Sequence, residues 1–198
     1  MVKRTWVVLG VLGLVACRKG PAENQALIAQ PAVVDSVVPI QAALRRFREG
    51  SPEVQRLSSG APTRAALVSQ LINALGASDT LAVEHLTVTR AEYAWLYYPT
   101  TAIARPPYEL PPALAWFQVQ EGNRKGALRL LRALGGRALD YQGVTCAAEP
   151  VTEGDNRIWT GCLVKLGVDG GTPSPQRLFA AILERHGRSA FLSFDNDL

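Results

Sequence analysis

The chain has 198 residues, of which 47% are hydrophobic and 19% are charged, and this composition excludes general disorder and predicts one domain with a hydrophobic core. The formal net charge of +4 falls to +2 when Lys3 and Arg4, which lie in an expected leader, are removed. A balance this close to neutral argues against a nucleic-acid-binding protein, which would carry a strong basic patch.

The first 17 residues have the three-part pattern of a secretory leader. A short basic start precedes an apolar run from Trp6 to Val15, which is far shorter than the roughly 20 residues that span a membrane. The run ends in Leu14-Val15-Ala16-Cys17, which resembles the lipobox of bacterial lipoproteins. The resemblance implies that residues 1–16 are a signal peptide and that Cys17 becomes an acylated N-terminus, which anchors the protein to a membrane. An ordinary signal peptide with a chance cysteine is the alternative.

The segment after the lipobox is predicted to be a membrane tether over residues 17–62. Gly, Pro and small polar residues are frequent in it, as in flexible linkers. A short helix from Pro39 to Glu49 is expected inside the tether, because Ile40, Leu44 and Phe47 recur at helical spacing. Residue 18 is Arg and not Asp, and in a two-membrane bacterium the lipoprotein pattern then implies the outer membrane, facing the periplasm.

A globular domain is expected over residues 63–198, and helices come first in it. Thr63 and Asp79 are predicted helix caps, and Thr89-Arg90-Ala91-Glu92 has the pattern of a capping box. Pro and Gly residues mark the remaining helix ends. The four predicted helices cover residues 63–76, 79–86, 89–98 and 112–134.

Strands are predicted after the helices. The pattern changes at Leu139, and turn-forming residues separate four apolar segments. These segments cover residues 139–147, 158–167, 176–184 and 189–194. The order of the elements predicts an α+β fold, in which N-terminal helices pack on one face of a curved four-stranded antiparallel sheet.

The stretch Thr63–Leu86, a helix, a Gly-Ala-Ser-Asp break and a second helix, resembles the opening of nuclear transport factor 2-like (SnoaL-like) domains. Such domains end on a bent antiparallel sheet that wraps round a cone-shaped cavity. The resemblance covers residues 63–198 as an order of elements, without a shared motif. It implies a cone-like fold with a cavity that serves either binding or an isomerase or cyclase reaction.

Cys146 and Cys162 are predicted to form a disulfide. The midpoint between them is Gly154, which lies in a turn-rich segment, so the two cysteines would face one another across antiparallel strands. An exported protein meets an oxidising compartment. A redox or metal-binding pair is the alternative, although the sequence has no Cys-x-x-Cys motif and only two histidines.

Few residues suggest catalysis. His85 and His186 have no neighbouring nucleophile or acid that would mark a triad, and no motif for a cofactor or a metal is found, so no cofactor is expected. Some glycosidases and isomerases need only two carboxylates, and Glu92, Glu109 and Asp140 are candidates for such groups. The preferred interpretation is that Glu92 is a helix cap and that the other two lie on the surface.

The stretch from Tyr93 to Phe117 is the most unusual part of the chain. It holds seven of the 14 aromatic residues, so we expect it to be ordered and to pack on the sheet, with Trp95 mostly buried. The expected partners on the sheet side are Phe179, Leu183, Leu192 and Phe194. An alternative role is a cavity mouth that binds a small ligand; it would be lined by Tyr97, Tyr98, Arg105, Tyr108 and Trp116.

These observations favour a lipid-anchored cell-envelope protein with a non-catalytic domain that binds an envelope protein or a small apolar ligand. The partners expected are therefore the membrane, through Cys17, and one such binding partner, with no nucleic acid. A cavity enzyme of the isomerase or cyclase type is one alternative, and a purely structural envelope lipoprotein is another.

Overall fold

The computed structural model describes residues 38–198, so the predicted leader, Cys17 and the first part of the predicted tether lie outside the described residues. Residues 38–62, which the sequence had assigned to the tether, belong to the same compact unit as the rest of this range. Leu44, Phe47 and Leu57 are buried in its core. Within residues 38–198 no helix has both the length and the apolar character that crossing a bilayer requires.

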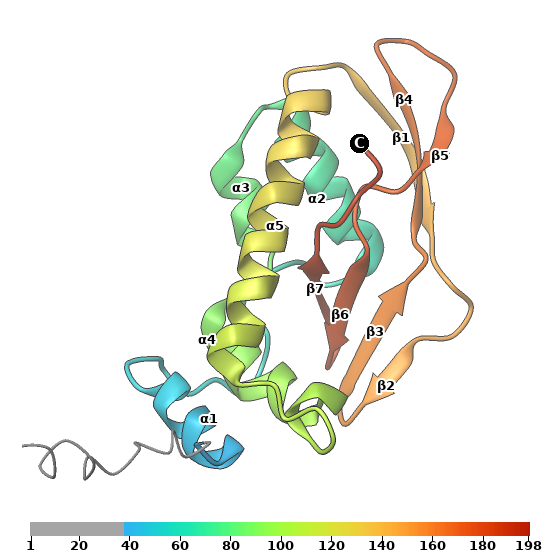
Figure 1. Ribbon diagram of the computed structural model, residues 1–198. Helices are drawn as coiled ribbons and strands as arrows, with labels where there is room; N and C mark the ends of the chain where they lie inside the picture. The colour runs from blue at the N-terminus through green and yellow to red at the C-terminus, as the bar shows by residue number, and fades with distance from the viewer. Residues whose placement is uncertain (1–37) are drawn as a thin grey trace, which may run out of the picture. The chain divides into compact units, whose positions relative to one another are not determined.

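The helices begin at the residues that the caps predict. The Thr63 side chain accepts a hydrogen bond from the Ala66 N–H (3.1 Å), and the Asp79 side chain accepts one from the Ala82 N–H (2.9 Å). The capping box that begins at Thr89 is confirmed. The helices are α1 (Ile40–Arg48), α2 (Arg64–Gly76), α3 (Thr80–His85), α4 (Arg90–Glu92) and α5 (Pro112–Leu134) (Figure 1).

The third predicted helix changes its winding at the aromatic residues. α4 continues directly into a π-helical turn, η1 (Tyr93–Tyr97), and then into a 3-10 turn, η2 (Tyr98–Thr100), that contains Pro99. A further 3-10 turn, η3 (Ala102–Ala104), follows. A π-helical turn is wider than an α-helical turn and a 3-10 turn is tighter, so both change the direction in which side chains point. Here they allow several successive aromatic side chains to reach the core.

Seven strands form two antiparallel sheets, so the prediction of a single four-stranded meander is wrong (Figure 1). The predicted strand 158–167 is divided at Gly161, which has a φ of +61°, and its two halves belong to different sheets. One sheet has the order β1-β4-β5 and the other the order β2-β3-β6-β7. The strands are β1 (Leu139–Thr145), β2 (Val151–Glu153), β3 (Asn156–Thr160), β4 (Leu163–Val168), β5 (Ser174–Gln176), β6 (Ala181–Arg185) and β7 (Arg188–Ser193).

Strands β3, β6 and β7 of the four-stranded sheet have buried side chains on both faces, because these side chains alternate between two hydrophobic clusters, whereas β2 is largely exposed. On one face, Trp159, Ile182 and Phe191 join a cluster with α2, the C-terminal half of α5 and the inner face of the three-stranded sheet. On the other face, residues of β3, β6 and β7 pack against α1 and the aromatic stretch. These residues are Ile158, Leu183, Ala190 and Leu192.

Most of the aromatic stretch therefore packs on the sheet, as predicted, whereas Tyr108 and Phe117 are exposed. Two of its expected partners, Leu183 and Leu192, share its cluster, whereas Phe179 and Phe194 belong to the other one. β7 ends at Ser193, so Phe194 no longer follows the alternation of that strand. Trp95 packs against the aromatic cluster but keeps part of its surface exposed.

Helix α5 lies against β7 through a junction of small and amide side chains. The Asn123 amide donates a hydrogen bond to the Leu192 carbonyl (3.2 Å) and accepts one from the Phe194 N–H (2.8 Å). A Cβ atom at Gly126 would overlap with the Phe194 carbonyl, so glycine permits the close approach of the two elements. A Cβ atom at Gly122, one turn earlier on the same helix, would by contrast meet no atom within 4 Å.

The outer edge of β7 is occupied along its length. Ala61 and Ser189 exchange two backbone hydrogen bonds (2.8 Å each). Further along the strand, Phe191 donates to the Leu86 carbonyl (2.9 Å) and accepts from the Val88 N–H (3.0 Å). The Asn123 side chain bonds to the same edge further along, at Leu192 and Phe194. Groups from three parts of the chain, at Ala61, at Leu86 to Val88 and at Asn123, thus occupy the place of a fifth strand.

Candidate functional site

A groove between α3 and α5 has a predominantly apolar lining. Its volume is about 490 Å³, which lies within the 300–1,000 Å³ that is typical of small-ligand pockets. The apolar walls come from α3, the segment after it, α5 and the end of β7, namely Val83, Val88, Trp116, Ala127, Leu128, Leu131 and Phe194. We call this cavity the α3–α5 groove.

One face of α5 forms a wall of the α3–α5 groove. Trp116, Gln120, Asn123, Ala127 and Leu131 follow one another at intervals of three or four residues, so they line up along the helix. The neighbouring stripe of α5, with Gly126, Leu130 and Leu134, is buried in the core. The helix therefore has a partly open apolar stripe beside its fully buried one.

Polar groups at the rim of the groove are already engaged with the protein. The Arg90 guanidinium donates to the Phe47 carbonyl (2.6 Å) and to the Ser51 hydroxyl (2.7 Å). The Arg124 guanidinium pairs with Glu121 (2.9 Å), and this hydrogen bond lowers the pKa of the Glu121 carboxyl. The two arginines at the rim are thus held by contacts within the protein, while the walls of the groove are apolar.

A larger depression of about 860 Å³ is lined by residues of α2, of α3 and of the loop before α2. Small and polar side chains such as Ser58, Asn73 and Asp79 line most of it. It offers less apolar surface than the α3–α5 groove, so it is a weaker candidate for an apolar ligand.

The aromatic residues predicted to line a cavity mouth gather instead round Tyr93. The ring centroid of Tyr93 lies 5.6 Å from that of Tyr97, 6.0 Å from that of Tyr98 and 5.1 Å from that of Trp116. Tyr98 is buried, and its hydroxyl donates to the Leu110 carbonyl (2.6 Å). Burial, followed by the charge of Glu153, raises the pKa of Tyr97 to about 12. Trp116 is the member of the predicted set that lines the α3–α5 groove.

Arg105 and Tyr108, the other two predicted ligand-binding residues, lie apart from this cluster on the exposed loop before α5. The Arg105 guanidinium donates to the Thr100 carbonyl (2.8 Å). Tyr108 is 69% exposed. The structure therefore does not bring the five predicted residues together round one cavity, and a binding role for the set stays a prediction.

Glu92 is the most deeply buried carboxylate that the sequence had singled out. Burial alone would raise its pKa, but hydrogen bonds from Ser59, Thr89 and Ser58 outweigh burial and lower it. Both serines donate through the backbone N–H and the hydroxyl, at 2.6–3.0 Å, and the Thr89 N–H lies at 2.8 Å. Its role as a helix cap is confirmed, and the same carboxylate also holds the loop before α2.

The other residues considered for catalysis lie on the surface. His85, His186, Glu109 and Asp140 are exposed, and they come from four separate segments. Among residues 38–198, no group of three His, Cys, Asp or Glu side chains gathers as a metal site would require. The Glu92 carboxylate is occupied by five donors, which leaves it little capacity to accept a proton.

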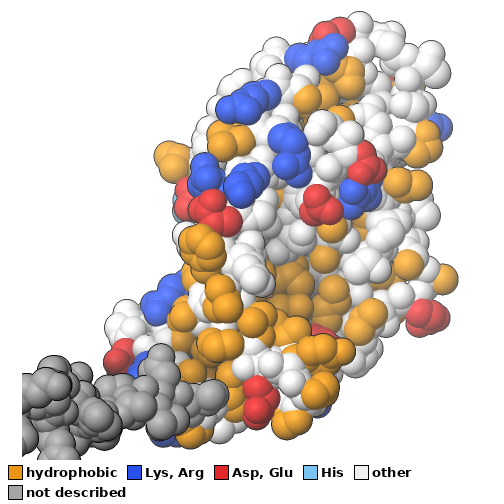
Figure 2. Space-filling view, in the orientation of Figure 1, with side chains coloured by type: hydrophobic (Ala, Val, Ile, Leu, Met, Phe, Trp, Pro, Cys, Tyr) orange, Lys and Arg blue, Asp and Glu red, His pale blue; other side chains and the backbone are white. Residues whose placement is uncertain are grey.

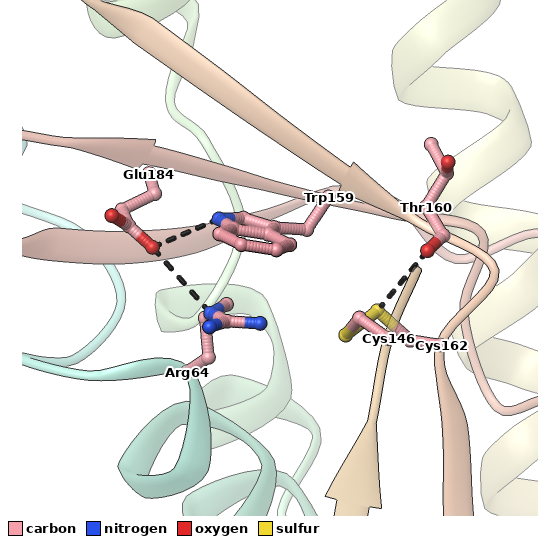
Figure 3. Close-up of a disulfide and its surroundings, with 6 residues drawn as sticks. All are labelled: Arg64, Cys146, Trp159, Thr160, Cys162 and Glu184. Atoms are coloured by element: carbon pink, nitrogen blue, oxygen red, sulfur yellow. Dashed lines mark hydrogen bonds and ion pairs between the residues drawn. A yellow bond between two sulfur atoms is a disulfide. The ribbon is translucent and has the colours of Figure 1, made fainter. Parts of the chain in front are cut away.

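The predicted disulfide joins Cys146 and Cys162, whose Cα atoms lie 3.8 Å apart. It extends the antiparallel pairing of β1 and β4, which ends at Thr145 and Leu163. Figure 3 shows the disulfide near Trp159, whose indole donates to Glu184 (2.9 Å). The bond therefore fastens the point where the chain passes from one sheet to the other.

Comparison with known proteins gave no match to a family model, a curated protein or a solved structure.

The sequence did not reveal most of the groove. Val83, Asn123 and Phe194 come from three distant segments, and each looks like an ordinary core or helix residue by itself. The spacing of Trp116, Gln120, Asn123, Ala127 and Leu131 was a usable signal, because it marks a second stripe on α5.

Proposed function

We propose that this protein is a lipid-anchored cell-envelope protein whose folded domain binds a small apolar ligand in the α3–α5 groove, without catalysing a reaction. The observation that carries the proposal is the groove itself, whose walls are formed by apolar side chains of α3, the segment after it, α5 and Phe194. Burial of apolar ligand surface contributes roughly 25 cal/mol per Å² before the costs of association. A ligand with a few polar atoms suits the polar rim.

Ligand binding can be tested with the neutral fluorescent probe N-phenyl-1-naphthylamine. Ala127→Phe places a large side chain inside the groove, and we expect it to raise the Kd at least tenfold. Ala113→Phe, on an exposed position of the same helix, is the matched control and should leave the Kd unchanged.

Leu128→Ser gives a second and milder test, because Leu128 lines the groove and is partly exposed. It should weaken probe binding without unfolding the protein, which circular dichroism checks. Equal probe affinity in the parent and in both groove variants would contradict the proposed site.

The lipid anchor is part of this proposal and rests on the pattern Leu14-Val15-Ala16-Cys17. We propose that the acylated Cys17 holds the domain at the outer membrane, facing the periplasm. Fractionation tests this: the parent should partition with membranes, and Cys17→Ser should give soluble or unprocessed protein. Equal membrane retention of the Cys17→Ser chain would count against the anchor.

We also propose that the fold of residues 63–198 is similar to that of nuclear transport factor 2-like domains. It is supported by the pair of helices α2 and α3 that opens residues 63–198 and by the antiparallel strands that follow. A bent sheet round a cone-shaped cavity is the finer part of that proposal. An experimental structure of the protein with the bound probe would test it.

A further inference from the structure

The end of the domain that carries α1 combines exposed apolar side chains with unpaired arginines. Figure 1 places α1, the helical turns after α4 and the start of α5 at this end, and α1 contacts both η1 and α5. Figure 2 shows hydrophobic side chains gathered round the N-terminal half of α5, whereas Lys and Arg side chains cluster towards its other end. We call the α1 side of the domain the basal end.

Helix α1 is fixed to the domain by its inner face. Leu44 and Phe47 are buried, and the Phe47 ring lies 6.4 Å from that of Tyr93. The Arg48 guanidinium lies 4.0 Å from the centre of the Trp95 ring and donates to the Ala94 carbonyl (3.1 Å). The position of α1 is therefore defined by packing, and its outer face is held in a fixed orientation.

The outer face of α1 is basic. Arg45 and Arg46 are exposed, and so is Arg56 on the following loop; none of the three forms an ion pair with a described residue. Residues 38–62 contain four arginines and two glutamates, so this segment carries a net charge of +2. Most arginines elsewhere in the domain have a carboxylate partner, as Arg137 has Asp169 (2.9 Å).

Exposed aromatic and aliphatic side chains occupy the same end. Tyr108 is 69% exposed and Phe117 is 59% exposed, and Leu114 lies between them in sequence with 46% exposed. Tyrosines and arginines beside apolar side chains are typical of surfaces that sit at the boundary of a lipid bilayer.

We propose that the basal end docks on an anionic bilayer, so that the domain lies against the membrane that anchors it. This inference rests on the proposed lipid anchor. The described chain begins at Val38, just before α1, and the 21 residues from Cys17 to Val37 span at most roughly 70 Å. The anchor therefore keeps the basal end within reach of the lipid headgroups, which attract basic residues near the surface.

Vesicle sedimentation tests the docking apart from the acyl chains. The protein is the mature chain from residue 17 with Cys17→Ser, and the vesicles contain 30% phosphatidylglycerol or phosphatidylcholine alone. The parent should bind the anionic vesicles and lose this binding at 0.5 M salt, because exposed charges are screened. Removing three charges in Arg45→Gln/Arg46→Gln/Arg56→Gln should reduce the partition coefficient at least tenfold.

The matched control removes three charges at exposed positions elsewhere, in Lys125→Gln/Arg132→Gln/Lys165→Gln, and should change binding less than threefold. A second pair of variants tests the exposed apolar side chains of the basal end. Tyr108→Ser/Phe117→Ser should weaken vesicle binding about tenfold, whereas the control Leu81→Ser/Leu163→Ser should leave it unchanged. These side chains are all exposed, so none of the variants should unfold the protein.

Equal losses in the basal and control variants would overturn the proposal, because binding would then follow net charge alone. A parent chain that does not bind anionic vesicles would overturn it too. In that case, membrane retention of the acylated protein would still support the anchor, so the failure of this inference and that of the proposed function are distinguishable.

Discussion

The Asn123 side chain hydrogen-bonds to the backbone of Phe194 as a neighbouring strand would. Its Oδ1 atom accepts from the Phe194 N–H (2.8 Å), while its Nδ2 atom donates to the carbonyl two residues earlier (3.2 Å). Both bonds are buried, and both fix α5 on the edge of the sheet. The same helix forms a wall of the α3–α5 groove, so this amide helps to hold one wall of the candidate site in place.

Asn123→Ala should therefore destabilise the protein. The change leaves one buried N–H and one buried C=O without their partners, and each costs about 1–3 kcal/mol. We expect the free energy of unfolding, measured with urea, to fall by about 2–5 kcal/mol. Gln118→Ala, on an exposed turn of α5, is the control, and a similar loss there would show that the effect is not specific to the junction.

Two glycines of α5 should respond to alanine in opposite directions. Gly122→Ala meets no atom within 4 Å and improves helix propensity, so it should stabilise the protein by about 0.8–1.0 kcal/mol. Gly126→Ala would overlap with the Phe194 carbonyl, and the forced shift of α5 should cost about 1–3 kcal/mol. Urea midpoints that move in the same direction for both variants would refute the close approach of α5 and β7.

Glu92 should make stability depend on acid pH. Its pKa is lowered in the folded protein from its ordinary value of 4.5, so its contribution is complete above pH 4.5 and is lost as the pH falls through the folded pKa. At pH 7, Glu92→Gln should cost about 2–3 kcal/mol, because hydrogen bonds to a charged acceptor are lost.

The pH profile separates this charge effect from packing. The difference in unfolding free energy between the parent and Glu92→Gln should shrink when the pH falls below 4.5. Glu149→Gln, on an exposed position, should show no such difference. A difference that stays constant from pH 7 to pH 3 would contradict a role for the carboxylate charge.

Removal of the disulfide should destabilise the protein by about 3 kcal/mol, which is the loop entropy expected for a closed loop of this length. The double change Cys146→Ser/Cys162→Ser should lower the urea midpoint accordingly. A reductant should lower the midpoint of the parent and leave that of the double variant unchanged. Identical responses to the reductant would show that the bond does not limit unfolding.

Local signals in the sequence were enough for the starts of the helices, the β6–β7 hairpin and the disulfide. Thr63, Asp79 and Thr89 cap helices through contacts within three residues, and the turn at His186 and Gly187 joins β6 to β7. Each of these features depends on neighbours in sequence, which is why pattern reasoning finds it.

The division into two sheets depends on distant pairing, and the sequence did not show it. Residues 158–167 form one apolar run, but the positive φ of Gly161 lets the chain leave the four-stranded sheet and pair with β1. The same reason applies to Glu92, whose partners Ser58 and Ser59 lie more than 30 residues away in a segment that appeared loose. The groove, too, exists only once α3, α5 and β7 have come together.

The row of backbone and side-chain groups that covers β7 has a consequence for how copies of this protein meet. A protein held on a membrane, as we propose, encounters its neighbours in two dimensions at high local concentration. Open strand edges would then recruit one another into continuous sheets. Because Ala61, Val88 and Asn123 already satisfy the edge of β7, this strand offers crowded copies no template for adding a further strand.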